Sequence, residues 1–123
     1  MLKIKRVYTK YEITDGITIL VDRLWPRGVR KTTLNAEIWM SEIAPSDSLR
    51  KWYAHDPKKW ARFKERYITE LKENPLVYEL IRIIRENPIV TLVYAASDTK
   101  HNNAVVLRGF MGRRVRGPAA HKA

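Results

Sequence analysis

The chain has no cysteine among its 123 residues and only three histidines. The first absence excludes disulfide bonds, thiol nucleophiles and cysteine-ligated metals. The histidines are His55, His101 and His121, and no two of them have the His-x-x-x-His spacing of a helical metal site. We therefore expect neither a bound metal nor a cofactor.

Long apolar runs are also missing. No stretch approaches the roughly 20 apolar residues that a membrane-spanning helix needs, and the first six residues alternate like a strand instead of forming a signal-peptide core. The prediction is a cytoplasmic protein without a membrane partner. Because the 123 residues contain no repeat or linker, we expect one domain over residues 1–112 and a basic, flexible tail over residues 113–123.

Acidic residues are few, with 13 Asp and Glu against 24 Lys and Arg, for a net charge of +11. The segments Arg23–Lys31 and Arg108–Lys122 contain four and five basic residues and no acid, and Arg50–Lys72 contains eight basic and three acidic residues. Such a charge attracts anionic small molecules and nucleic acid. A solvated or heat-adapted surface explains the same composition, so the sequence leaves both interpretations open.

Hydrophobic patterning predicts an α/β domain. Residues 17–21 are apolar at nearly every position, which is typical of a strand buried on both faces, and Asp56-Pro57 and Asn74-Pro75 each start a helix. The expected strands lie at residues 2–8, 17–21 and 89–96, and the expected helices at 34–43, 57–71, 75–87 and 103–112. A helical connection between the second and third strands favours a parallel pair. The fold class is therefore α/β, a small parallel or mixed sheet of three to four strands flanked by helices in a single domain.

Two of these strands are followed by polar segments, residues 22–28 and 97–102. If the strands are parallel neighbours, both segments open at one edge of the sheet, where α/β proteins bind ligands. Arg23 and Arg27 would hold a phosphate or carboxylate through forked hydrogen bonds, and Trp25 would offer a stacking face. The alternative is that Arg23 pairs with Asp98 or Asp22 and that Trp25 packs at the edge of the core.

Candidate proton-transfer groups lie in the same segments. Asp98 and His101 are three residues apart where a strand becomes a helix, and with Asp22 they would supply catalytic carboxylate and imidazole groups. The alternative is that Asp98 or Ser97 caps the helix and His101 packs in its first turn.

A second aromatic and basic segment follows. His55 lies just outside the cap residue Asp56, and Trp52 lies among lysine and arginine residues. Both are candidate ligand-binding residues, because aromatic rings among basic side chains are typical of nucleic-acid surfaces. Trp60 falls on the apolar face of its helix, which indicates a place in the core.

Several blocks resemble one family in a consistent order. They are residues 21–28 (VDRLWPRG), 42–46 (EIAPS), 49–53 (LRKWY), 55–60 (HDPKKW) and 94–96 (YAA) with Asp98. Together they resemble the YeaO-like branch of the domain-of-unknown-function family DUF-488, which implies a small α/β protein without an assigned activity. The family pattern implies a histidine where this chain has Asn103, a Cys-His pair near Asn102 and Asn103 in more distant branches, and an aspartate in place of Glu37. The first two differences argue against catalysis.

Three hypotheses follow from the residues and the resemblance. The first is an anion site at the strand ends, in an unassigned or vestigial enzyme. The second is a non-catalytic nucleic-acid-binding module that uses the basic segments. The third is a protein-interaction domain whose charges are solvated.

Overall fold

The computed structural model describes residues 1–30 and 36–116. Its four strands are β1 (Leu2–Arg6), β2 (Ile17–Leu20), β3 (Ile38–Trp39) and β4 (Val90–Tyr94). They form one sheet in the order β1-β4-β2-β3 with every neighbouring pair parallel. The predicted α/β class with a parallel sheet is confirmed.

The helices are α1 (Asp47–Tyr53), α2 (Trp60–Lys72), α3 (Leu76–Glu86) and α4 (Asn103–Arg116), with short 3₁₀ turns at Ile13–Asp15, Ser41–Ile43 and Pro57–Lys59. Helices begin close to both predicted starts, although α2 itself begins at Trp60 and the turn that Asp56 caps is a 3₁₀ turn. Asp56 accepts a hydrogen bond from the Lys58 amide (3.0 Å), and Asn74 accepts one from the Leu76 amide (3.0 Å). No helix in the described ranges is long and apolar enough to cross a membrane.

Two predicted boundaries were wrong. The helix expected over residues 34–43 is, from residue 36 onward, strand β3 and a 3₁₀ turn, because Ile38 and Trp39 pair in register with β2; residues 34 and 35 lie outside the described part. Helix α4 continues past Gly112 to Arg116, since Val115 packs against the core and this outweighs the roughly 1 kcal/mol that a helical glycine costs. Residues 117–123 of the predicted tail lie outside the described ranges.

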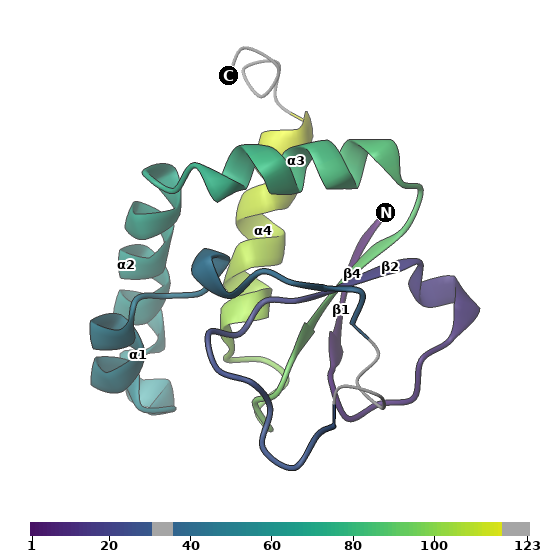
Figure 1. The fold of residues 1–123 in the computed structure, drawn as a ribbon. Coiled ribbons are helices and arrows are strands. Elements are labelled where there is room, and N and C mark those ends of the chain that lie inside the picture. The colour runs from purple at the N-terminus through teal and green to yellow at the C-terminus, as the bar shows by residue number, and fades with distance from the viewer. Residues whose placement is uncertain (31–35, 117–123) are drawn as a thin grey trace.

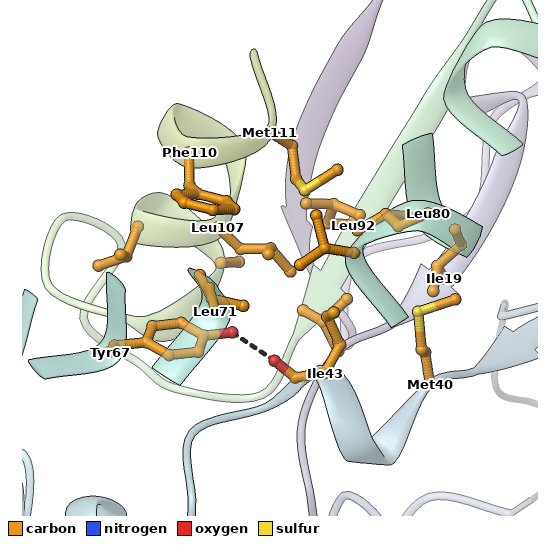
Figure 2. Close-up of a cluster of buried hydrophobic side chains, with 14 of the residues drawn as sticks. Ile19, Met40, Ile43, Tyr67, Leu71, Leu80, Leu92, Leu107, Phe110 and Met111 are labelled. Carbon is orange, nitrogen blue, oxygen red and sulfur yellow. Dashed lines mark hydrogen bonds between the residues drawn. The ribbon is translucent and has the colours of Figure 1, made fainter. Parts of the chain in front are cut away.

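The helices cover one face of the sheet (Figure 1). On that face Ile19, Leu92 and their neighbours pack against side chains of α2, α3 and α4 in one continuous core. Figure 2 shows the centre of this core, where the fully buried Tyr67 donates a hydrogen bond to the Ile43 carbonyl at 2.7 Å. Burial raises the pKa of Tyr67 well above its ordinary value, so its hydroxyl stays a neutral donor.

Loops cover the other face of the sheet. A smaller cluster of Val7, Leu20 and Val93 packs there against Trp25 and other partly buried loop residues. The apolar pattern of β2 predicted burial on both faces, which the structure confirms, but it did not distinguish a cover of helices from a cover of loops.

A buried carboxylate fastens the first loop to the sheet. Asp15 is 3% exposed and contacts Lys5 Nζ at 2.8 Å and Lys3 Nζ at 3.6 Å. Burial by itself would raise the pKa of Asp15, but hydrogen bonds from Lys5 and from the Glu12 amide, with the lysine charges, lower it below 3.8. The next residue is Gly16, with φ of 64°, where a Cβ atom would lie 2.1 Å from the Ile89 carbonyl oxygen. Only glycine fits this approach.

We predict that Asp15→Asn lowers the free energy of unfolding by about 2–3 kcal/mol at neutral pH, because Lys5 loses the buried carboxylate at 2.8 Å and is left with the exposed Glu12 at 3.5 Å. Urea denaturation measures the change. Since the folded pKa of Asp15 is lowered, the wild-type advantage should be present above pH 3.8 and disappear as the pH falls through the folded pKa. Glu86→Gln, at an exposed ion pair with Arg82, is the control and should change stability by less than about 1 kcal/mol; equal losses would contradict the role given to Asp15.

Candidate functional site

A cavity of about 320 Å³ lies at the carboxyl ends of β2 and β4. These strands are parallel neighbours, so the segments that follow them start at the same edge of the sheet. Of the two predicted segments, residues 22–27 line the cavity, whereas none of residues 97–102 does. The wall is completed by residues before and within α1, by the turn after α1 and by the first turn of α4. The lining residues are Tyr8, Asp22, Arg23, Leu24, Trp25, Pro26, Arg27, Ala44, Pro45, Arg50, Tyr53, His55, Phe63, Ala95, Ala96 and Asn103.

Asp22 joins the two strand ends. Its Oδ2 accepts a hydrogen bond from the Ala95 amide at 2.8 Å, and Asn103 beside it donates to the Val21 carbonyl at 2.9 Å. Burial raises the pKa of Asp22, although hydrogen bonds from Ala95 and Asn103 and the nearby His55 oppose the shift. The carboxyl group is thus held in place and is easier to protonate than an exposed aspartate.

Arg23 is fixed against the backbone. Its Nε and Nη2 donate to the carbonyls of Pro45 (3.0 Å) and Ala44 (3.2 Å), and Nη1 lies 3.5 Å from Glu42. Its acidic neighbours are thus Glu42 and, at 3.9 Å, Asp47, instead of the predicted Asp22 or Asp98. Arg23 places a positive charge at the cavity wall with few donors left over.

Trp25 and Arg27 form the outer wall. The Trp25 indole donates to the Val29 carbonyl at 2.6 Å and meets the Trp39 ring edge-on at 5.3 Å. Arg27 is exposed at the rim, and its carbonyl accepts a hydrogen bond from the Tyr8 hydroxyl at 3.2 Å. Trp25 therefore both packs at the edge of the core and lines the cavity, and Arg27 is the more accessible of the two predicted arginines.

Helix α1 and the turn behind it supply residues that the strand-end argument did not assign. Arg50 lines the cavity, donates to Asp47 at 3.1 Å, and has a buried Nε without a hydrogen-bond partner in the described part of the chain. No local pattern marked Arg50 as more than one basic residue among eight. His55 was predicted as a ligand residue and does line the cavity; it follows Ala54 in a turn where both residues have positive φ (45° and 58°).

Asp98 and His101 do not line the cavity. They pair with each other at 3.0 Å, and Asp98 also accepts the Lys100 and His101 amides at 2.9 Å each. The bond from the Lys100 amide is the main reason why the pKa of Asp98 is lowered. Asn102 caps α4 by accepting the Val105 amide at 3.0 Å, so the cap is neither Ser97 nor Asp98. His101 packs edge-on against Trp60 at 5.1 Å.

Trp52 also lies outside the cavity. Lys59 Nζ and the Arg66 guanidinium lie 5.0 and 4.4 Å from the centre of its ring. The ring that was expected to stack on a ligand thus makes cation–π contacts within the protein. Within residues 1–30 and 36–116, no group of three or more His, Asp or Glu side chains is arranged to hold a metal ion.

Comparison with known proteins places this arrangement in a family. The chain matches the inactive DUF488-N3 subclade over residues 1–121. It belongs to the DUF488 family. It is 40% identical to the uncharacterized protein YeaO of Escherichia coli (strain K12) over 110 residues, 89% of this chain and 96% of YeaO. It is 36% identical to the uncharacterized protein Rv3073c of Mycobacterium tuberculosis (strain H37Rv) over 113 residues, 92% of this chain and 95% of that protein. No solved structure gives a significant match.

Membership of the DUF488 family confirms the predicted resemblance and draws attention to Asn103. This side chain lines the cavity at the position where the family pattern implied a histidine, and its amide is bonded to the Val21 carbonyl. An amide does not titrate near neutral pH and cannot exchange a proton as imidazole does. In this DUF488 protein the side chain at that position instead links α4 to the end of β2 through its hydrogen bond to the Val21 carbonyl.

We predict that Asp22→Asn gains stability relative to wild type as the pH rises. Asparagine keeps an acceptor for the Ala95 amide, whereas the wild-type carboxyl has a raised pKa. The stability that this carboxyl contributes to the wild type is present below pH 3.8 and is lost as the pH rises through its folded pKa. Urea denaturation at a series of pH values measures the difference between the two proteins.

Asp98→Asn is the matched control for this measurement. The pKa of Asp98 is lowered in the folded protein, so the difference between Asp98→Asn and wild type should change with pH in the opposite direction. A difference between Asp22→Asn and wild type that does not vary with pH would contradict the burial of the Asp22 carboxyl.

Proposed function

We propose that the cavity binds a small anionic molecule with an apolar body, and that the protein acts as a binding protein and not as an enzyme. The observation that supports this most directly is the charge of the lining. Among the described residues, the arginines Arg23, Arg27 and Arg50 line one space with a single carboxylate, Asp22.

The three arginines differ in the hydrogen-bond donors that they have available for a ligand. Arg27 is exposed, and Arg50 lines the cavity and donates through Nη2 to Asp47, which leaves Nη1, so these two have donors for contact with a phosphate or carboxylate. Arg23 is held by two carbonyls and contributes a fixed charge. Asp22 is the opposing charge, and the Ala95 amide that donates to its Oδ2 offsets part of it.

The remaining wall is apolar and aromatic. Leu24, Trp25 and Phe63 line the cavity together with Tyr8 and Tyr53. Ligand cavities commonly measure about 300–1,000 Å³ and combine an apolar wall with a few polar groups. A volume of about 320 Å³ therefore suits a small metabolite with an acidic group at one end.

Several observations support binding without chemistry. The Asp98–His101 pair, which was the predicted proton-transfer unit, lies outside the cavity. Asn103 offers an amide that is already bonded to the backbone. The matching DUF488 subclade is itself described as inactive.

Thermal denaturation with inorganic phosphate, a short carboxylic acid and a nucleoside monophosphate tests the proposal. A ligand at 100 times its Kd stabilises the folded state by about 2.7 kcal/mol, which raises the Tm by several degrees in a domain of this size. We expect at least one of these anions to raise the Tm of the wild type, and Arg27→Ala and Arg50→Met to reduce that shift by more than half.

Arg82→Ala is the matched control, since it removes one exposed guanidinium that is paired with Glu79 and Glu86 on α3, away from the cavity. It should leave the ligand-induced shift unchanged. No shift with any of the three anions, or an equal reduction by Arg82→Ala, would overturn the proposal.

A further inference from the structure

A second basic surface lies between α2 and α4, away from the cavity. The two helices run side by side in the same direction (Figure 1). At their start, the ring of Trp60 lies 5.1 Å from that of His101, and at their end Ile68, Lys72, Phe110, Arg113 and Arg114 line one groove. We call these five residues the α2–α4 groove.

The charges of these helices are not balanced within the protein. Helix α4 carries four arginines and no acidic residue, and α2 carries four basic residues against Glu65 and Glu70. Glu70 is bonded to the backbone amide and hydroxyl of Ser46. Among the ion pairs of the described residues, none uses a lysine or arginine of α2 or α4.

Helix electrostatics explain only part of this excess. Basic residues in the last turn of a helix interact favourably with its dipole, which accounts for Lys72, Arg113 and Arg114. It does not account for Lys64, which is exposed and lies one turn before Ile68 on the same face of α2. The positive charge beside the groove therefore extends beyond what the helix ends require.

We propose that the α2–α4 groove binds the phosphodiester backbone of nucleic acid without reading its sequence. The Arg114 guanidinium lies 4.9 Å from the centre of the Phe110 ring, and Phe110 is only 5% exposed. That ring is thus covered by a cation and does not offer a face for a base. An apolar helix would likewise find little contact area, whereas closely spaced phosphates match three neighbouring cations. This surface is independent of the anion cavity.

Fluorescence anisotropy tests the proposal with a labelled single-stranded DNA, an RNA of the same sequence and the DNA duplex, at 50 to 200 mM salt. We expect binding that weakens steeply with salt, by about 0.7 to 0.9 logarithmic units of affinity per logarithmic unit of salt for each phosphate contacted. The triple variant Lys72→Gln, Arg113→Gln, Arg114→Gln should bind at least about tenfold more weakly and lose about 2–3 from the salt slope. The form of nucleic acid bound most tightly identifies the source of the phosphates.

The charge-matched control is Lys10→Gln, Lys51→Gln, Arg82→Gln, which removes three positive charges from other elements. It should weaken binding no more than about threefold, and circular dichroism should show both triple variants folded. Equal losses in the two variants would assign binding to net charge alone. Absence of binding at 50 mM salt, or equally tight competition by poly-glutamate of matched charge, would also overturn the proposal, the last by indicating an acidic protein partner.

Discussion

The parallel pairing of β2 with β4 is the constraint on which the rest of the structure depends. It sets Thr18 opposite Thr91 and Leu20 opposite Val93, so the two strands end at the same level. The hydrogen bond from the Ala95 amide to Asp22 then joins the segment that follows β4 to the segment that follows β2. The cavity, the positions of Arg23 and Arg27 and the contact of Asn103 with Val21 all follow from this one alignment.

Much of this arrangement could be predicted from the sequence, because it rests on strong local patterns. The nearly continuous apolar residues of β2 and β4 identified the buried strands, and their shared edge placed Asp22, Arg23, Trp25 and Arg27 around one space. His55 was predicted as a ligand residue from its aromatic and basic surroundings and not from that edge. What could not be predicted depends on partners distant in the chain. A two-residue strand such as β3 exists only because β2 lies beside it, and Arg50 reaches the cavity only because α1 packs where it does. Asp98 and His101 have a suggestive spacing, but their own turn directs them elsewhere.

Positive charge has two different settings in this DUF488 protein. At the cavity Arg23 is held by two carbonyls and Arg50 by Asp47, which limits their motion and suits recognition of one small group. On α2 and α4 they project from helices without ion-pair partners among the described residues, which suits a long and uniform polyanion. The location and bonding of the basic side chains therefore say more about their roles than the net charge of +11 does.

The helices pack on one face of the sheet, and loops cover the other. This division separates the residues that keep the protein folded from many of those that surround the cavity. A substitution in the loop after β2 changes the cavity wall and leaves the contacts of Tyr67, Leu80 and Leu107 intact. A change of side chain at the cavity wall can therefore alter what the cavity accepts while the packing of the core stays as it is. Asn103 fits this division, since its amide bonds the Val21 carbonyl at the end of β2.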